Sequence, residues 1–304
     1  MPDNKNPLLC DPQSGICEMP GMASSGEIKA GMATPKPVKV IYFTDPICSS
    51  CWGIEPQLRK LKLEYGDNLE IEYRMGGLLP DWSYNSGGIS KPSDVAHHWD
   101  EVSIHYDMPI DGDVWLEDPL DSSYPPSIAF KAAEMQDDKK AIDFLRAIRE
   151  MVFLHKKNIT RWEHLEAAAV ASGLNPEQMK RDMEGKALEL FQEDLKMGRS
   201  MGVRGFPTMF FLDAKNNREL VYGSKPYAAY EAAVLKLYPG AAKHPYDRST
   251  EKLFKYYSSL TVREFSELSG TPGGEAASTL QSFTEQGFLE RLDTKNGSLW
   301  RVRR

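Results

Sequence analysis

Two cysteines separated by two residues, Cys48 and Cys51, follow directly on an apolar, β-type segment at residues 38–43. A cysteine at a helix start lies over unpaired backbone N–H groups and the positive end of the helix dipole, which stabilise its thiolate. Cys48 has that position, and Cys51 is close enough to attack a mixed disulfide that Cys48 has formed. The spacing therefore predicts a pair that cycles between dithiol and disulfide, with Cys48 as nucleophile and Cys51 as resolving thiol.

A second pair, Cys10 and Cys17, lies in an N-terminal leader rich in Gly, Pro, Ser, Met and Lys. The turn-forming residues 11–15 between them could bring the two thiols into contact. Three interpretations stay open: an incidental pair in a floppy leader, a second redox pair tethered to the first, or half of a metal site. Zinc is the least favoured, because a tetrahedral site needs four ligands, and no metal site is predicted.

Asp45 precedes the loop that carries the two central cysteines. Its carboxylate could assist proton transfer from Cys51, but Asp-Pro is also ordinary turn chemistry, and the turn is the favoured interpretation. Ser49 and Ser50 are expected to tune the neighbouring thiol through local hydrogen bonds without reacting themselves.

Length, composition and net charge limit which classes of protein this chain can belong to. The chain has 304 residues, 41% of them hydrophobic, and a formal net charge of −7. This length and composition predict a globular protein with two domains, or one large domain and an appendage. The negative charge argues against general affinity for nucleic acid or anionic membranes, which reward a basic surface.

The chemistry expected of the cysteine pairs also depends on the cellular compartment. No run of about 18 apolar residues occurs, and the first 37 residues lack the apolar core of roughly 7–15 residues that a secretory signal needs. We therefore expect a cytoplasmic protein without a membrane segment. Thiols there are mostly kept reduced, so close cysteine pairs indicate redox or metal chemistry rather than structural disulfides. A cytoplasmic pair is expected to reduce or rearrange protein disulfides.

The elements that must position these cysteines can be read from periodicity. Residues 38–43 are a strand, 49–65 a helix kinked at Pro56, and 69–75 a second strand, a unit that favours parallel pairing. Residues 80–125 are rich in loops and in aromatic residues whose burial is the default expectation. Further helices are predicted near 92–106 and at 127–136, 139–155, 161–172 and 176–201, followed by a hairpin at 208–212 and 219–222 and a helix at 227–237.

Two of the helix starts carry cap signals. Thr160 to Glu163 fits a capping box, and Asn175-Pro176 fits an N-cap followed by proline at the first helical position. The chain is thus predicted to divide into a mobile leader at 1–37 with its cysteine pair, a domain at 38–244 with a helical insertion at about 90–200, and a C-terminal module at 245–304.

The C-terminal module has the pattern of a winged helix: three short helices at 249–258, 261–270 and 275–287, then a hairpin turning at Asn296-Gly297. Residues 246–304 hold nine Lys/Arg against eight Asp/Glu, and the third helix carries Glu275 and Glu285 but no basic residue. Because phosphate contacts need cations, a protein-interaction or packing module is favoured over DNA binding.

Three features together resemble the thioredoxin superfamily: Cys48-Ser-Ser-Cys51 after a strand, Pro56 five residues later, and Gly205-Phe206-Pro207-Thr208 opening a later strand. The intervening helical block resembles the DsbA branch. The resemblance implies an α/β thioredoxin fold with a DsbA-type helical insertion, plus the small winged-helix-like module. It also implies a cis bond at Pro207 facing the cysteines, with Phe206 and Pro207 binding a substrate chain.

A closer resemblance is to DsbA-like predicted dithiol–disulfide isomerases and to the related SpxH (YjbH) family of ClpXP adapters. Residues 111–115, 127–134 and 157–160 look like stretches of the adapter family, as does the C-terminal extension. Adapter members bind the regulator Spx and present it to the ClpXP protease, which need not use thiols. In contrast, residues 76–80 and 203–207 look like the catalytic members, and the leader lacks the adapter's His-rich start.

The first hypothesis is therefore a thiol–disulfide oxidoreductase that acts on a protein substrate with disulfides or thiols and is reset by an external thiol reductant. It requires no metal or organic cofactor. The alternative is an SpxH-like adapter whose partners are an Spx-like regulator and ClpXP. A DNA-binding redox sensor is a distant third.

Overall fold

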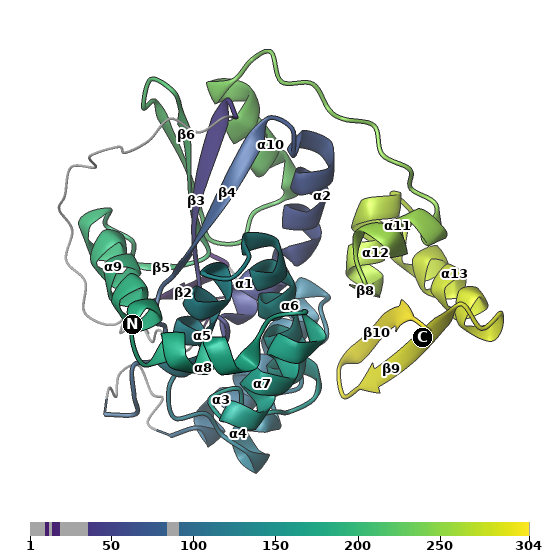
Figure 1. Ribbon diagram of the computed structural model, residues 1–304. Coiled ribbons are helices and arrows are strands. Elements are labelled where there is room, and N and C mark those ends of the chain that lie inside the picture. Colours follow the sequence, from purple (N-terminus) through teal and green to yellow (C-terminus); the bar gives the residue numbers. More distant parts are fainter. Residues whose placement is uncertain (1–9, 12–13, 19–35, 84–90, 304) are drawn as a thin grey trace, which may run out of the picture.

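The computed structural model describes residues 10–11, 14–18, 36–83 and 91–303 (Figure 1). Most of the predicted leader, and Tyr84 of the aromatic loop region, lie outside these ranges. None of the helices in the described ranges combines the length and the apolar character that a membrane span requires.

A four-stranded sheet in the order β4-β3-β6-β7 forms the centre of the molecule. Its strands are β3 (Val38–Thr44), β4 (Leu69–Met75), β6 (Thr208–Asp213) and β7 (Arg218–Tyr222). β3 pairs in parallel with β4 and antiparallel with β6, and β6 pairs antiparallel with β7. Every residue of β3 except Lys39 is buried, as expected for an apolar strand covered on both faces. The predicted strand–helix–strand unit is thus confirmed.

The helix after β3 is interrupted rather than kinked. α1 (Ser49–Gly53) ends at Ile54, and α2 (Glu55–Tyr65) begins at once, with Pro56 in its first turn. Proline costs nothing there, because the first N–H groups of a helix have no intrahelical partner. α2 carries the chain back to β4 and packs against α10 (Tyr227–Leu237).

The helical insertion between β4 and β6 gathers at one end of the sheet (Figure 1). Its helices are α3 (Ser93–Tyr106), α4 (Val114–Glu117), α5 (Tyr124–Glu134), α6 (Asp138–Leu154), α7 (Trp162–Ala171), α8 (Pro176–Met183) and α9 (Lys186–Ser200). Trp99 and Trp115 are buried in the main core, 5.1 Å apart between ring centroids. The default expectation of burial is therefore confirmed for both.

Two predictions inside the insertion are wrong. The predicted helix 176–201 is two helices, because the chain turns at Gly185, the N-cap of α9. The predicted capping box at Thr160 does not form: Arg161 is the N-cap of α7, and the Thr160 hydroxyl donates to Asn158 Oδ1 at 2.5 Å. The Asn175 cap is confirmed, since its side chain accepts from the backbone N–H of Gln178 at 3.0 Å.

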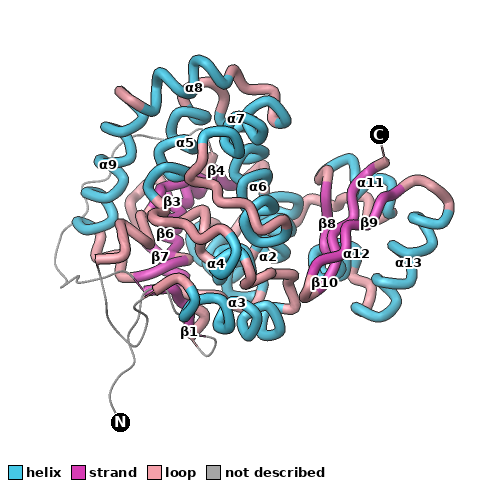
Figure 2. Tube along the Cα trace, turned by 90° about the horizontal axis from the view of Figure 1, so that it is seen from below, coloured by secondary structure: helices cyan, strands magenta, loops and turns pink. Residues whose placement is uncertain are grey.

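The C-terminal module has its own apolar core and sheet (Figure 2). Helices α11 (Thr250–Tyr256), α12 (Val262–Ser269) and α13 (Gly273–Glu285) precede the hairpin β9 (Leu289–Thr294) and β10 (Gly297–Val302). A short strand that was not predicted, β8 (Ser259–Thr261), pairs with β10. The hairpin turns at Lys295-Asn296, one residue earlier than predicted, because Gly297 pairs with Thr294.

Part of the leader is also regular. β1 (Cys10–Asp11) pairs antiparallel with β2 (Ile16–Glu18), and β2 pairs antiparallel with β5 (Gly205–Phe206). These three strands form a small sheet separate from the central one. The leader therefore reaches the residues that precede Pro207.

Candidate functional site

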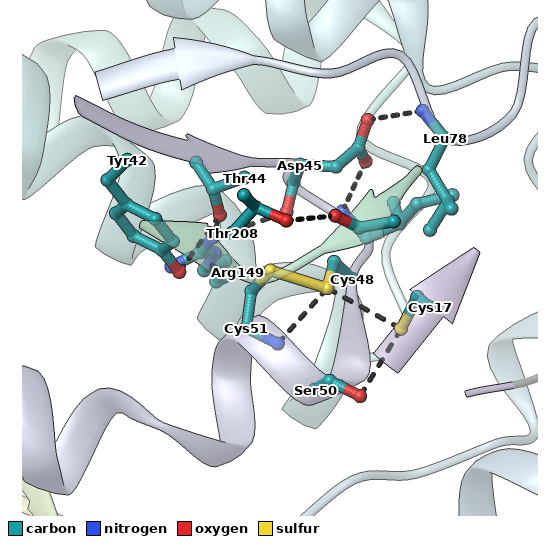
Figure 3. The surroundings of a disulfide bond; sticks show 12 residues. Cys17, Tyr42, Thr44, Asp45, Cys48, Ser50, Cys51, Leu78, Arg149 and Thr208 are labelled. Carbon is teal, nitrogen blue, oxygen red and sulfur yellow. Dashed lines mark hydrogen bonds between the residues drawn. A yellow bond between two sulfur atoms is a disulfide. The ribbon is translucent and has the colours of Figure 1, made fainter. Parts of the chain in front are cut away.

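Cys48 and Cys51 form a disulfide at the start of α1 (Figure 3). Cys48 is the N-cap, and its Sγ accepts a hydrogen bond from the backbone N–H of Cys51 at 3.1 Å. Both side chains are fully buried. The helix start thus directs a backbone donor at the sulfur on which negative charge develops when the disulfide opens, as the spacing predicts.

The peptide bond between Phe206 and Pro207 is cis, as the resemblance implies. Phe206 is fully buried, and its ring lies over Gly76, where an added Cβ would fall 1.7 Å from the ring. Phe206 also pairs with Cys17 across the β2–β5 ladder. Glycine at position 76 therefore gives Phe206 the room to hold the cis-proline strand in place.

Asp45 is fully buried beneath the cysteine loop. Its carboxylate accepts from the backbone N–H of Ile47 (3.0 Å) and of Leu78 (2.8 Å) and from the hydroxyl of Ser123 (2.9 Å). Burial raises its pKa to about 6, although these hydrogen bonds act in the opposite direction. The Ile47 bond and the bond from Cys48 N to Asp45 O (3.2 Å) form the turn that was favoured for this residue.

Arg149 of α6 lies behind this loop and was not identified from the sequence. It is 1% exposed, and its guanidinium donates to Thr44 Oγ1 at 2.6 Å, to the Asp45 carbonyl at 3.2 Å and to Glu55 at 2.7 Å. A signal exists: Arg149 falls among the buried residues of the amphipathic helix. A buried cation needs a partner of opposite charge, and that partner is Glu55, whose side chain is 13% exposed.

Cys17 is the member of the second pair that the structure brings to the site. Its Sγ lies 3.5 Å from Cys48 Sγ and 3.4 Å from Ser50 Oγ, and Ser50 in turn lies 2.7 Å from the Tyr106 hydroxyl. The side chain of Cys10 is outside the described residues. Within the described ranges, no group of three or more His, Cys, Asp or Glu side chains has the arrangement of a metal site.

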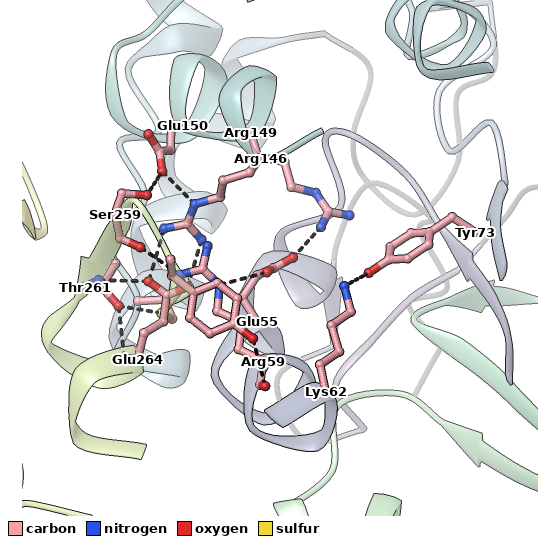
Figure 4. A network of polar contacts seen from close by, with 12 residues as sticks. Glu55, Arg59, Lys62, Tyr73, Arg146, Arg149, Glu150, Ser259, Thr261 and Glu264 are labelled. Atoms are coloured by element: carbon pink, nitrogen blue, oxygen red, sulfur yellow. Dashed lines mark hydrogen bonds and ion pairs between the residues drawn. The ribbon is translucent and has the colours of Figure 1, made fainter. Parts of the chain in front are cut away.

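A second polar cluster joins the C-terminal module to the rest of the molecule (Figure 4). Arg146 donates to both oxygens of Glu264, at 2.8 and 3.1 Å, and Arg59 lies 3.3 Å from the same carboxylate. Glu264 is fully buried and forms a capping box with Thr261. Burial alone would raise the pKa of Glu264, but Arg146 and Arg59 outweigh it and hold that pKa below its ordinary value.

A thioredoxin family model matches residues 42–232. The ClpXP adapter protein SpxH of Halalkalibacterium halodurans is 33% identical over 307 aligned positions, which cover 99% of both chains. SpxH of Shouchella clausii is 31% identical with 96% of each chain covered, and SpxH of Bacillus subtilis is 28% identical with 88% of this chain and 89% of the other covered.

Solved structures share the fold of the thioredoxin part. A putative protein disulfide isomerase from Nitrosomonas europaea has a TM-score of 0.55 at 22% identity and covers 66% of this chain and 95% of its own. The cytosolic disulfide reductase DsbM from Pseudomonas aeruginosa has a TM-score of 0.52 at 21% identity, with coverage of 66% and 99%. About a third of this chain therefore has no counterpart in either structure, whereas the SpxH matches extend over most or all of it.

Proposed function

The chain belongs to the SpxH family of thioredoxin-fold proteins, and from that membership we propose that it is an adapter that binds a regulatory protein of the Spx type and presents it to a ClpXP-type protease. The similarity to SpxH over 99% of both chains carries the proposal. It reverses the order of the two leading hypotheses, because the disulfide-exchanging neighbours have no counterpart for about a third of the chain.

The way the C-terminal module is attached supports this role. A buried carboxylate bound by two arginines from the thioredoxin part, Glu264 with Arg146 and Arg59, gives the module a defined orientation. The Tyr257 hydroxyl donates to the Arg59 carbonyl at 2.9 Å, and the Arg59 guanidinium stacks on the Tyr257 ring. These contacts fix the module relative to the thioredoxin part, so that surfaces on the two parts keep a constant relation to each other.

The test is a degradation assay with purified components. The full chain is added to ClpXP and a purified Spx-type regulator, and loss of the regulator is followed by gel. We expect several-fold faster degradation with the chain than without it, and the same acceleration with the Cys48→Ala/Cys51→Ala variant. No acceleration and no binding of the regulator by the folded chain would exclude the adapter role.

Thiol–disulfide exchange is the second candidate, and the cysteine pair at the helix start with a cis-proline strand nearby favours it. The Cys48 thiolate would attack a substrate disulfide and release one substrate thiolate. The Cys51 thiolate would then attack Cys48 Sγ, release the second substrate thiolate and leave Cys48–Cys51 oxidised. A backbone strand beside Pro207 would hold the substrate, and an external thiol would reset the pair.

Equilibration of the chain in glutathione buffers tests this chemistry, with the state of Cys48 and Cys51 read by mass spectrometry after alkylation. A reversible two-electron couple between about −120 and −270 mV fits an oxidoreductase. Turnover of a disulfide substrate should disappear in the Cys48→Ala/Cys51→Ala variant. The absence of a reversible couple would leave only the adapter proposal.

A further inference from the structure

The strand edge beside the cis-proline is already occupied by the chain itself. Antiparallel pairing places Cys17 opposite Phe206 and Glu18 opposite Gly205. Addition of an extended segment to an open strand edge is a general mode of peptide recognition. We propose that the leader strands β1 and β2 are a built-in substrate of the Cys48–Cys51 pair: β2 binds this edge, and the leader exchanges disulfides with Cys48 through Cys17. The proposal rests on the exchange chemistry of the second candidate function and is independent of the adapter role.

The leader is fitted closely to this position. The carbonyl of Gly15 accepts from the backbone N–H of Ser224 at 2.7 Å, and a Cβ on Gly15 would fall 2.6 Å from the Ser224 side chain. Gly15 also has φ +68°, which favours glycine. The next two residues, Ile16 and Cys17, are 8% and 0% exposed. Backbone pairing, a glycine fit and side-chain burial thus fix the same short segment.

The sulfur atoms stand at reacting distance. Cys17 Sγ is 3.5 Å from Cys48 Sγ, close to the separation of about 3–3.5 Å that characterises near-attack geometries. The backbone N–H of Cys51 points at Cys48 Sγ, where it stabilises that sulfur as attacking or leaving thiolate. An intramolecular reaction in this arrangement gains from an effective concentration far above that of an external thiol.

The strand register places the second cysteine of the leader, Cys10, next to Cys17. Cys10 lies directly opposite Cys17 in the β1–β2 ladder. Directly opposed residues of an antiparallel pair have Cα atoms about 4.5–5.5 Å apart, which falls within the range that a disulfide spans. Cys17 itself is disulfide-bonded. We take Cys10 as the partner that closes the exchange.

The exchange balances without an outside oxidant. With the leader pair oxidised and the central pair reduced, the Cys48 thiolate attacks Cys17 Sγ, and the Cys10 thiolate leaves. The Cys51 thiolate then attacks Cys48 Sγ, and the Cys17 thiolate leaves. Two electrons and two protons pass from the central pair to the leader pair. An incoming substrate chain must displace the leader from its edge and competes with it for Cys48.

Trapping the mixed disulfide tests the first half of the proposal. The full-length Cys10→Ser/Cys51→Ser variant keeps only Cys17 and Cys48, and mild oxidation followed by non-reducing peptide mapping should find them linked. In the matched Cys17→Ser/Cys51→Ser variant, the Cys10–Cys48 link should form at least about tenfold more slowly, because Cys17 Sγ is held 3.5 Å from Cys48 Sγ, whereas Cys10 lies on the strand one step further from β5. Equal rates, or a folded chain without the Cys17–Cys48 link, would overturn the proposal.

Removal of the leader from the β5 edge tests the second half of the proposal, that the leader occupies this edge and shields Cys48. Gly15→Val introduces both a strained φ and a clash with Ser224, so reduced Cys48 should react with iodoacetamide at least about tenfold faster than in the unmodified chain, where it is fully buried. A chain lacking residues 1–18 should behave in the same way. An unchanged rate in both would exclude leader occupancy. A missing glutathione couple in the truncated chain would instead refute the oxidoreductase candidate.

Discussion

The two ends of the chain pack against the same thioredoxin core by different means. The C-terminal module is joined through the buried carboxylate of Glu264, which Arg146 and Arg59 of the thioredoxin part bind. Within the described residues, the leader is joined through a two-residue strand ladder, a backbone hydrogen bond to Ser224 and the buried side chains of Ile16 and Cys17. Removal of one partner from a buried ion pair leaves an uncompensated charge, whereas a strand edge accepts any extended chain. We therefore expect the first attachment to be permanent and the second to be exchangeable.

The same contrast appears in two buried carboxylates. Glu264 at the module interface is compensated by cations, and its pKa is lowered. Asp45 under the cysteine loop is bound by neutral donors, and burial raises its pKa to about 6. A carboxylate that favours its charged form stabilises a joint between domains. A buried carboxylate whose pKa is raised instead makes the stability of the cysteine loop depend on pH.

The largest effect is expected at Glu264. Glu264→Gln keeps the shape of the side chain but removes the buried carboxylate that Arg146 and Arg59 share, and leaves Arg146 with Glu150 and Arg59 with Glu55. The change should lower the free energy of unfolding by about 3 kcal/mol, the lower end of the range for breaking a buried ion pair. Denaturant unfolding measures the loss. Glu290→Gln is the control: Glu290 pairs with Arg301 on the exposed hairpin, so its loss should cost less than about 1 kcal/mol. Similar losses in both variants would contradict a permanent, ion-pair-dependent attachment.

Asp45 should show its effect in the pH dependence. Its folded-state pKa, about 6, lies above its ordinary value of 3.8, so the folded state binds more protons between these values and stability falls as pH rises through them. The shift corresponds to about 2–3 kcal/mol between pH 4 and 7. Asp45→Asn should remove this decline in urea titrations.

The control for this titration is Asp67→Asn, which removes an 85% exposed carboxylate and should leave the decline carried by Asp45 in place. A decline that persists in Asp45→Asn would show that another group, and not the buried loop carboxylate, carries the pH dependence. The opposite dependence is expected from Glu264, because a lowered pKa contributes stability that is lost as pH falls through the folded-state value.

Prediction from the sequence succeeds where local pattern and tertiary packing agree. The bounds 69–75 and 227–237 are confirmed as β4 and α10, and Cys48 lies at a helix start because an apolar strand leads straight into the helix. Prediction fails where pairing with a segment distant in the sequence determines whether an element forms. β8 is only three residues long and exists because β10 pairs with it, and β1 and β2 depend on β5, almost 190 residues away.

The capping boxes show the same limit. Thr160 and Thr261 both precede a glutamate by three residues, yet only the box at Thr261 forms. The Thr160 hydroxyl instead binds Asn158, a local competitor that the motif does not reveal. Arg149 was missed for a related reason: an arginine is ordinarily exposed, and only its position among buried residues of α6 indicates an internal partner.

An intermediate effect is expected at Gly76, where an added Cβ would lie 1.7 Å from the ring of Phe206. Gly76→Ala places a Cβ against the buried ring of Phe206, and the displacement should cost about 1–3 kcal/mol in the free energy of unfolding. Gly273→Ala is the matched control, because nothing lies within 4 Å of an added Cβ there. Since Phe206 pairs with Cys17, the variant should also raise the alkylation rate of Cys48. Equal stability of both variants would refute the tight fit.

The smallest effect is expected at the rim of the module interface. Lys295 Nζ lies 2.6 Å from Asp100 and 2.7 Å from Asp113, but its side chain is 40% exposed. Lys295→Ala should therefore cost only about 0.2–1 kcal/mol, and the loss should vanish in about 1 M salt, where screening acts over about 3 Å. Asn296→Ala removes hydrogen bonds that an uncharged amide donates to the Asp100 carboxylate and the Ile110 carbonyl, so its loss should depend on salt much less than that of Lys295. If the Lys295→Ala loss persists in salt, the exposed contacts of Lys295 would contribute to the attachment of the module in the same way as the buried cluster around Glu264.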